Sequence, residues 1–488
     1  MSRGDATRLP EGRHFALTWT IPETYGGQTS SMLHRSRAFV RIGGTPVALL
    51  TFDPRPDYPA LERRLRERGE LIDGMRVINL WDWLRKHDVP RRNAPLGSPE
   101  RVFTPLAPDP EHRSEHRGRV EVIRTRFAAD LQTVLQIDHY RADGSLLLSD
   151  RRDACERGVL GGRSLVLCDR AGEPVRSWGT SWSLYAWWLD RLTEGADAFL
   201  LVDSKPMAKF LLTYRRPGRA TMHIVHGSHL YGMAGPWGKL RESREQVMRN
   251  LDAFDAVALL TRRHKRDVWL RWGPKRHLSV LPNSRTLPDL PAGFQARAPE
   301  RGMMLATLAP LKRADHAIRA LGLARKWSGA DVRLDIYGDG PQRERLGRII
   351  QETGVSDAVR LRGYRPDARE RLTEASFLLL TSTSEGFGLV LVEAMAAGCI
   401  PIAYDIRYGP SEIITHGRTG FLVRSGDLNG LARTIARLQR MPADRVERMR
   451  TAARRAAEHF SDEAVVPLWS RELTAALERN RATIPPQE

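Results

Sequence analysis

Cysteine is scarce in this chain, with only Cys155, Cys168 and Cys399 among 488 residues. The three are widely separated and show no metal-ligand spacing, so they form neither a disulfide framework nor a cysteine-based zinc site. We interpret all three as small core residues, because free cysteine is among the most often buried residue types. Neither crosslinks nor a metal centre is therefore expected to organise the fold.

Long apolar runs are also missing. No run approaches the roughly 18 to 20 residues that a membrane-spanning helix needs. The segment from Met1 to Gly12 carries charges of both signs and has no apolar signal core. We therefore expect a cytoplasmic protein, and a peripheral contact with the inner face of a membrane stays open.

Acidic residues are fewer than basic ones, with 58 Asp and Glu against 77 Lys and Arg and a formal net charge of +19. Such an excess implies affinity for polyanions. No zinc-finger spacing, RNA-binding aromatic pair or basic helix with a heptad repeat occurs, so nucleic acid is not the expected partner. A membrane surface, a phosphate-rich polymer and a solvated arginine-rich face with no partner remain open.

One stretch combines features that packing alone does not require. Between Ser384 and Met395 lie two carboxylates, two glycines and an apolar run. We predict a strand at 377–380, a turn, and a helix from Leu389 to Ala397 that Gly398 stops. Glycines let the backbone approach a ligand, and the unpaired N–H groups of a first helical turn attract phosphate. The stretch therefore predicts an anion site.

The two carboxylates of this stretch are Glu385, just before the predicted helix, and Glu393, eight residues later and inside it. They need not converge on one atom, as a general acid and base would. We expect them to flank the phosphates, with one carboxylate accepting hydrogen bonds from hydroxyl groups on each side. A nucleotide-sugar suits this arrangement.

The N-terminal part begins with a β-loop-α-β pattern. Strands are predicted at 14–19 and 47–52, and a helix at about 30–40. The loop between them carries Gly26 and Gly27 at the carboxyl end of the first strand, where open α/β sheets bind ligands. A tight turn with no ligand is the alternative reading of this glycine pair.

Three histidines surround the carboxyl end of a further predicted strand at 220–229: His223, His226 and His229. We favour a neutral imidazole that hydrogen-bonds a substrate. A satisfied structural histidine and a metal site are the alternatives, although His226 and His229 lack a third convincing metal ligand.

An antiparallel insertion is predicted at about 118–182. Residues 131–140 alternate with period two, a turn at 142–144 follows, and return strands are expected at 145–149, 164–169 and 175–178. A sheet with one free face commonly serves self-association or the docking of a partner.

Beyond about residue 300 a second α/β half is predicted, with strands at 303–308, 332–337, 359–364 and 400–405. Glycine-rich turns at strand ends favour two doubly wound sheets with a ligand cleft between them. The predicted parts are 1–89 and 189–290 (the N-terminal Rossmann-like acceptor domain), 90–188 (linker and β-meander insertion), 291–460 (the nucleotide-sugar-binding domain) and 461–488 (a helix that crosses back to the N-terminal domain, then a tail).

These motifs resemble a known family. Glu385 and Glu393, preceded by the turn 338–341 and by Lys312 with Asp315, resemble the retaining glycosyltransferase family four, which has the GT-B fold. The segments 403–414 and 26–29 and the inserted meander look like the branch that contains the poly(glycerol- or ribitol-phosphate) α-glycosyltransferases of wall teichoic acid. The bacterial adhesin O-GlcNAc transferases belong to the same branch.

The resemblance implies metal-free transfer from a UDP-sugar with retention at the anomeric carbon, and no cofactor besides this donor. It places Glu393 at the ribose, Glu385 at the donor sugar and Lys312 at the diphosphate. The implied catalytic residues are Lys312, Glu385, His229 and His226; the implied donor-binding residues are Gly26, Gly27, Gly338, Gly363, Tyr364, Gly386, Phe387, Gly388, Leu389, Val390 and Glu393.

One position departs from the family pattern. The family usually carries arginine five residues before the matching lysine, and Thr307 occupies that position here. A hydroxyl cannot replace a bidentate guanidinium at a phosphate. Weakened catalysis, a substitute cation from another loop and an unusual donor are the alternatives.

We expect a bacterial enzyme that moves glucose or N-acetylglucosamine from a UDP-sugar to an anionic polyol-phosphate or cell-wall glycan. The first alternative is an acceptor of another kind, a protein serine or threonine or a small natural product. The second is a catalytically weak UDP-sugar-binding or scaffold protein. The resemblance also implies a homo-oligomer formed through the β insertion.

Overall fold

The computed structural model describes residues 8–90, 103–232, 235–288 and 297–484. The chain forms two compact units. One comprises Met1–Glu11, Thr24–Thr45 and Leu201–Glu488, and the other comprises Gly12–Glu23 and Pro46–Leu200. Among the described helices, none is both long and apolar enough to cross a lipid bilayer.

The Pro46–Leu200 unit contains three complete parallel strands and most of a fourth. Their register aligns His14 with Val47 and Val47 with Met75. In the strands at 13–18 and 47–51 the interior positions are all buried, as expected of parallel strands that are covered on both faces. In the strand at 75–79, by contrast, Arg76 is exposed and Val77 and Ile78 are half-buried. Its elements outside the meander are β1 (Arg13–Thr18), β2 (Val47–Thr51), α2 (Tyr58–Glu67), β3 (Met75–Asn79), α3 (Leu80–Lys86), α4 (Ser181–Leu192) and most of β10 (Ala198–Val202).

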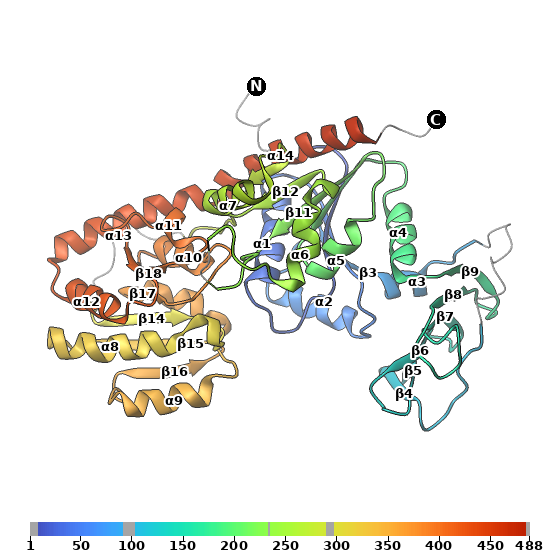
Figure 1. The fold of residues 1–488 in the computed structure, drawn as a ribbon, viewed down its shortest axis with the longest axis horizontal. Coiled ribbons are helices and arrows are strands. Elements are labelled where there is room, and N and C mark those ends of the chain that lie inside the picture. The colour runs from blue at the N-terminus through green and yellow to red at the C-terminus, as the bar shows by residue number, and fades with distance from the viewer. Residues whose placement is uncertain (1–7, 91–102, 233–234, 289–296, 485–488) are drawn as a thin grey trace. The chain divides into compact units, whose positions relative to one another are not determined.

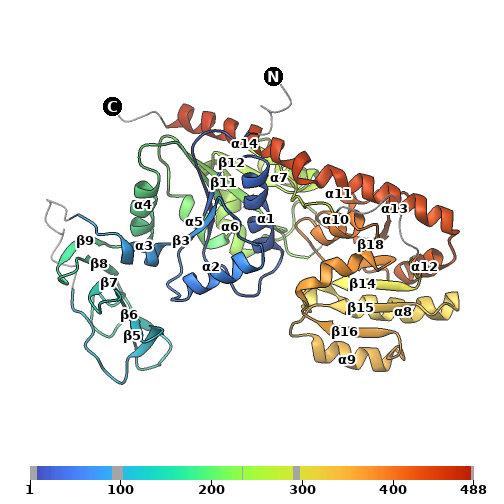
Figure 2. The ribbon, with the colours of Figure 1, turned by 180° about the vertical axis from the view of Figure 1, so that it is seen from behind.

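The same unit holds the predicted antiparallel meander, in which each strand pairs with the next in sequence (Figure 2). Its strands are β4 (Arg113–Arg117), β5 (Val120–Phe127), β6 (Val134–Tyr140), β7 (Leu146–Arg151), β8 (Ser164–Cys168) and β9 (Pro174–Trp178). The turn at Gly144 is confirmed: Arg141 N donates to Ser145 O at 2.9 Å, and Gly144 has φ 83°. The charged strand β4 was missed because it has no apolar alternation.

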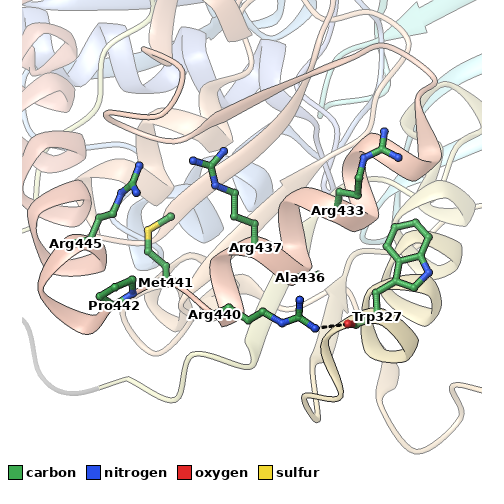
Figure 3. A pocket seen from close by; sticks show the side chains of 8 residues that line it. All are labelled: Trp327, Arg433, Ala436, Arg437, Arg440, Met441, Pro442 and Arg445. Carbon is green, nitrogen blue, oxygen red and sulfur yellow. Dashed lines mark hydrogen bonds between the residues drawn. The ribbon is translucent and has the colours of Figure 1, made fainter.

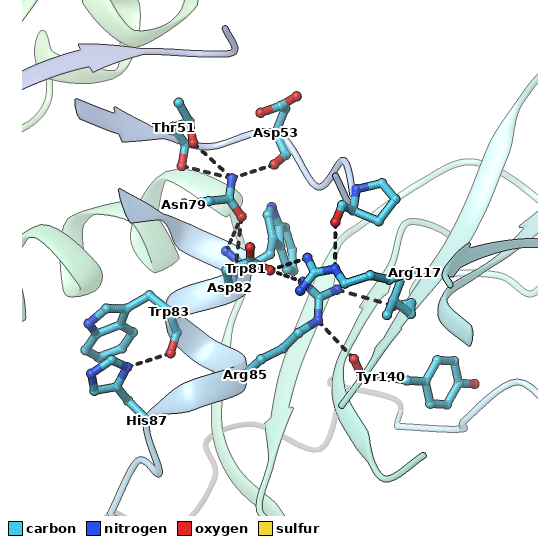
Figure 4. Close-up of polar contacts among 12 residues, drawn as sticks. Thr51, Asp53, Asn79, Trp81, Asp82, Trp83, Arg85, His87, Arg117 and Tyr140 are labelled. Atoms are coloured by element: carbon cyan, nitrogen blue, oxygen red, sulfur yellow. Dashed lines mark hydrogen bonds and ion pairs between the residues drawn. The ribbon is translucent and has the colours of Figure 1, made fainter. Parts of the chain in front are cut away.

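Helix α3 ties the meander to the parallel strands through polar contacts (Figure 4). The Asn79 side chain caps α3 by accepting from the N–H groups of Trp81 and Asp82. Asp82 in turn accepts from Arg85 at 3.0 Å and from Arg117, a meander residue, at 2.5 Å. Arg85 also donates to the Tyr140 carbonyl at 3.0 Å. The Asn79 cap and the Asp82 carboxylate thus fix the position at which the meander joins the parallel strands.

Two of the three cysteines are buried as predicted, Cys168 and Cys399. The prediction was wrong for Cys155, which is exposed. It lies in the loop between β7 and β8, where its backbone N–H donates to the Gly161 carbonyl and its side chain is left outside the core.

The Leu201–Glu488 unit contains two groups of parallel strands. In the first, β11, β12 and β13 pair side by side. The predicted helix at 30–40 begins three residues earlier, so Gly27 is helical and Gly26 precedes it. The elements are α1 (Gly27–Arg41), α5 (Lys205–Leu211), β11 (Arg219–Val225), α6 (Glu242–Arg249), η1 (Leu251–Ala253), β12 (Ala256–Leu259), α7 (Arg262–Trp272) and β13 (Leu278–Val280).

The second group is a six-stranded parallel sheet in the order β16-β15-β14-β17-β18-β19, with helices beside it (Figure 1). This order, with a crossover after β16, is that of a Rossmann-like sheet. The strands are β14 (Arg301–Leu305), β15 (Arg333–Tyr337), β16 (Val359–Gly363), β17 (Phe377–Leu380), β18 (Ile400–Asp405) and β19 (Phe421–Arg424). The helices are η2 (Pro310–Lys312), α8 (Ala314–Ser328), α9 (Arg343–Glu352), η3 (Pro366–Thr373), α10 (Leu389–Ala396), α11 (Pro410–Ile413), α12 (Leu428–Gln439), α13 (Ala443–Ala457), η4 (Glu458–Phe460) and α14 (Asp462–Thr483).

Helix α14 packs against α1, β11 and β12. The Asn480 side chain donates to the Arg219 carbonyl and to Asp255 at 3.1 Å each. The α/β fold with an antiparallel insertion is confirmed, whereas the predicted domain bounds stay a prediction. Residues 91–102, in the predicted linker and insertion 90–188, and residues 289–296, at the predicted boundary between the two α/β domains, lie outside the described residues, as do 1–7 and 485–488.

Candidate active site

The predicted strand-turn-helix is present as β17, the loop 381–388 and α10. Gly388 precedes the helix with φ 87°, a conformation that favours glycine. No side chain caps α10, and its first turn contains no acidic residue. Its first N–H groups therefore have no capping acceptor among the described side chains, and such free groups attract anions. The anion site at this helix start stays a prediction.

Two glycines in this region are required by close backbone contact. A Cβ on Gly386 would lie 1.9 Å from the His226 carbonyl oxygen, and a Cβ on Gly409 would lie 1.6 Å from the Phe387 carbonyl oxygen. Either distance is far below van der Waals contact. The loop before α10 thus rests directly on the backbone that follows β11, which brings His226 beside the candidate donor site.

Glu385 is held by a cation and a hydroxyl. Lys312 Nζ lies 2.5 Å from Glu385 Oε1, and Ser382 Oγ donates to the same oxygen at 2.7 Å. The Lys312 and Glu385 side chains are 24% and 15% exposed, so a ligand can still reach the pair. Two residues 73 positions apart, both predicted to act on the donor, therefore meet.

Glu393 is also paired. Arg285 Nε lies 2.7 Å and Arg369 Nε 3.2 Å from Glu393 Oε1. Both guanidinium groups also donate to Ser30 Oγ, at 3.2 and 3.1 Å. Burial lowers the pKa of Arg285, although Glu393 partly offsets this effect. The carboxylate predicted to hold a ribose is thus enclosed by two arginines that the sequence did not indicate.

These arginines also reach the start of α1, where Ser30 lies one turn after the glycine pair. A Cβ atom on Gly26 or Gly27 would have no neighbouring atom of the described residues within 4 Å, and no side chain caps α1. Packing against the described residues therefore does not require either glycine, and the donor roles of Gly26 and Gly27 stay predictions.

The His226 ring is oriented by a buried carboxylate. Its Nε2 lies 2.6 Å from Asp203 Oδ1, while Arg35 binds both oxygens of Asp203 at 2.9 and 2.7 Å. Burial alone would raise the pKa of Asp203, but Arg35 and His226 lower it to about 2. Asp203 is therefore a permanent anion that fixes the imidazole. Asp203 directly follows the buried strand β10, and this position in the sequence was the signal that could have identified it as a site residue.

His229 has a different environment. It is fully buried, and its Nδ1 lies 2.9 Å from His264 Nε2. The His264 ring stacks on Tyr408, whose hydroxyl donates to Asp267 Oδ2 at 3.0 Å. Burial lowers the pKa of His229 to about 4, so the ring is neutral at pH 7. This geometry favours His226 over His229 as the group that faces a ligand, and both roles stay predictions.

The turn after β15 packs on the loop after β14. Cβ atoms on Gly338 and Gly340 would lie 1.9 and 2.7 Å from the carbonyl oxygens of Ala306 and Leu308, and both glycines have positive φ. Gly338 N donates to Gly363 O at 2.8 Å, and Tyr364 beyond it is 58% exposed. Close packing explains Gly338 and Gly340 without a ligand, so the donor roles of Gly338, Gly363 and Tyr364 stay predictions.

Thr307, the position where the family has arginine, is exposed in this same loop. Among the described residues, no group of three or more His, Cys, Asp and Glu side chains is arranged to hold a metal ion.

A basic surface lies on helices α8, α12 and α13 (Figure 3). It is a groove of about 590 Å³ lined by Trp327, Arg433, Ala436, Arg437, Arg440, Met441, Pro442 and Arg445. Arg440 donates to the Trp327 carbonyl across it. None of the predicted site residues lines this groove.

The comparisons with known proteins concern the family and the fold. Residues 299–456 match the family described as glycosyl transferases group 1. The chain is 36% identical to an exopolysaccharide phosphotransferase of Streptomyces coelicolor over 303 residues, which are 60% of this chain and only 30% of that protein. It is 22% identical to the poly(ribitol-phosphate) alpha-N-acetylglucosaminyltransferase of Staphylococcus aureus, over 93% of this chain and 98% of that one.

Among solved structures, a variant of S. aureus TarM in complex with fondaparinux, alpha-GlcNAc-glycerol and UDP is similar, with a TM-score of 0.79 at 19% identity. The similarity covers 95% of this chain and all of that one. At 19% identity, the similarity to this structure establishes the fold of the chain. The chain thus has the GT-B fold, and its residues 299–456 match the group 1 glycosyl transferases.

Proposed function

We propose that the chain is a retaining glycosyltransferase that moves a hexose, glucose or N-acetylglucosamine, from a UDP-sugar to an anionic polyol-phosphate polymer. The observation that carries the proposal is the ion pair between Lys312 and Glu385, which lies just before the start of α10. Glu393 lies inside the same helix. These groups match the three parts of a nucleotide-sugar: the sugar, the diphosphate and the ribose.

The proposed chemistry follows from charge. A departing UDP gains negative charge on its β-phosphate in the transition state, and fixed donors aimed at developing charge are usually the largest catalytic term. The Lys312 ammonium and the N–H groups of Phe387 to Val390 would supply them. Because these protein groups take the place that a divalent cation has in other sugar transferases, we propose that catalysis needs no metal.

We assign the remaining contacts with the UDP-sugar from the positions of the side chains around α10. Glu393 would accept hydrogen bonds from the ribose hydroxyls, and Glu385 would orient the donor sugar. His226, fixed by Asp203, would hydrogen-bond the sugar or the leaving group. The open starts of α1 and α10 would enclose the diphosphate from two sides.

The anionic acceptor is proposed from two facts. The net charge of +19 favours a polyanion. The S. aureus relative that matches along almost its whole length acts, by its name, on poly(ribitol-phosphate). We place the enzyme in the cytoplasm, where UDP-sugars are made, with peripheral contact to the inner membrane face as a further part of the proposal.

The test is UDP release. The purified chain is incubated with UDP-glucose or UDP-N-acetylglucosamine and with poly(ribitol-phosphate) or poly(glycerol-phosphate), with and without EDTA. We expect UDP release that depends on the polymer and survives EDTA. No release with any donor, together with no UDP binding by calorimetry, would overturn the proposal. Release with a serine-containing peptide or a small natural product in place of the polymer would support the first alternative.

Self-association through the β4–β9 meander is a separate part of the proposal. Its support is the likeness of this insertion to the teichoic acid branch. Light scattering is expected to show an oligomer at micromolar concentration, and a monomer under these conditions would reject it.

A further inference from the structure

Three cationic side chains from α5 and the start of α6 lie close together: Lys205, Arg241 and Arg244. None of them has a carboxylate partner among the described residues. Lys205 begins α5, whereas Arg241 and Arg244 lie at and just inside the start of α6. Lys205 Nζ donates to the hydroxyl of Ser243, between the two arginines, at 3.2 Å. The three side chains therefore belong to one cluster.

The acidic residues nearest in sequence are not ion-paired with this cluster. Asp203 is already bound by Arg35 and His226. Glu245 pairs with Arg249 at 2.7 Å. Glu242 is exposed and forms no ion pair with the three cations. Within the described part of the chain, the positive charge of the cluster is therefore not neutralised.

Arg244 is half-buried and lies against the backbone of Gly227. Its Nη2 is 3.0 Å from the position that a Cβ on Gly227 would occupy. Burial and the neighbouring Arg241 lower the pKa of Arg244 to about 10, and burial with Arg244 and Arg241 lowers the pKa of Lys205. Like charges held together in a half-buried place destabilise the folded state, and a bound anion would remove this cost.

The cluster borders the candidate donor site. Arg241 Nη2 lies 3.5 Å from the hydroxyl of Ser384, the residue before Glu385, and Arg241 Nε donates to the Leu230 carbonyl at 2.9 Å. Gly227 follows His226, whose carbonyl contacts Gly386. Arg241 thus borders Ser384, Arg244 borders Gly227, and Lys205 joins the two arginines through Ser243.

We infer that Lys205, Arg241 and Arg244 form a phosphate-binding site for the acceptor, which places a polyol hydroxyl beside the donor sugar by holding the adjacent phosphodiester. Guanidinium groups suit this task because they bind phosphate oxygens in a bidentate manner. The inference rests on the proposed function and adds which residues select a phosphorylated acceptor.

The experiment measures the binding of a short glycerol-phosphate oligomer in the presence of UDP by calorimetry, for the wild type and for Lys205→Ala, Arg244→Ala and Arg244→Lys. The alanine variants are expected to weaken oligomer binding by about tenfold and to leave UDP affinity unchanged. Arg244→Lys is expected to recover part of the loss. Lys205 is exposed, so its variant tests the inference even where Arg244→Ala fails to fold.

The matched control is Arg445→Ala, which removes one positive charge from the groove of Figure 3 and is expected to bind the oligomer as the wild type does. Equal weakening by Arg445→Ala would mean a general charge effect and would overturn the inference. Loss of UDP affinity in the Lys205 and Arg244 variants would overturn it too, because the site would then serve the donor phosphates.

The two proposals fail differently. If the wild type transfers sugar to the polymer while the Lys205 and Arg244 variants bind and use the oligomer normally, the inference is wrong and the proposed function stands. If the wild type neither binds the oligomer nor transfers sugar to any polyol-phosphate, the proposed acceptor class is wrong, and with it the inference.

Discussion

Arg285 Nε lies 2.7 Å from Glu393 Oε1, and the Arg285 side chain is only 7% exposed. Arg369 contacts the same carboxylate oxygen from a side chain that is 53% exposed. One buried and one exposed arginine therefore neutralise the carboxylate that is proposed to bind the ribose, and they form a natural pair of matched variants.

We expect Arg285→Ala to lower the free energy of unfolding by about 3 kcal/mol, because it leaves Glu393 and Ser30 without their buried partner. Arg369→Ala should cost less than about 1 kcal/mol, since an exposed ion pair contributes little. Urea denaturation checks both values. Equal losses in the two variants would show that burial does not set the strength of these pairs.

Glu393→Gln should weaken UDP binding by about tenfold, because a carboxylate accepts stronger hydrogen bonds from ribose hydroxyls than an amide does. Glu374→Gln is the control, since Glu374 is 55% exposed and pairs with Arg371. Calorimetry with UDP alone measures the effect without turnover. Unchanged affinity in Glu393→Gln would remove Glu393 from the donor site.

Lys312→Ala should lower kcat about 100-fold to 1,000-fold while UDP affinity changes by a few-fold at most, because its charge is needed mainly as the diphosphate departs. Lys326→Ala, which removes an exposed charge from α8, is expected to behave as the wild type. Steady-state rates of UDP release give kcat. A variant whose kcat stays normal but whose KM for the donor rises would instead assign Lys312 to ground-state binding.

Gly386→Ala should abolish activity, because its Cβ would overlap the His226 carbonyl oxygen and push the loop before α10 away from the N-terminal half. Gly347→Ala, in α9, has open space around the new methyl group. It should stabilise the protein by about 0.5 to 1 kcal/mol, since alanine favours a helix over glycine. Activity assays and denaturation together separate the two effects, and an active Gly386→Ala would contradict the close contact.

Stability should fall as the pH is lowered from about 6.5 to about 4. The pKa of His229 is about 4 in the folded protein against an ordinary value of 6.5, so in this window the unfolded state binds the proton and the folded state does not. The difference corresponds to about 3 kcal/mol. Urea denaturation across this range measures the slope, and His229→Gln should reduce it. An unchanged slope in that variant would show that His229 is not a buried neutral imidazole.

The sequence predicted the elements of the donor half well because buried parallel strands are continuous apolar runs and glycine turns end them. Phe377–Leu380 and the helix start at Leu389 are as predicted. The family resemblance, and not the sequence pattern, implied that Lys312 and Glu385 belong to one site. It did not predict Arg285, Arg369 or His264, because a lone arginine in a connecting segment or a histidine in a helix carries no pattern that reveals its distant partner.

The proposed transfer is tested most directly by the product. Poly(ribitol-phosphate) and poly(glycerol-phosphate) are incubated with the chain and a ¹³C-labelled UDP-sugar, and the purified polymer is examined by NMR. We expect labelled sugar on the polyol in α linkage, with the anomeric configuration of the donor retained. A β-linked product would contradict retention, and a polymer without label for both donors and both polymers would contradict the proposed function.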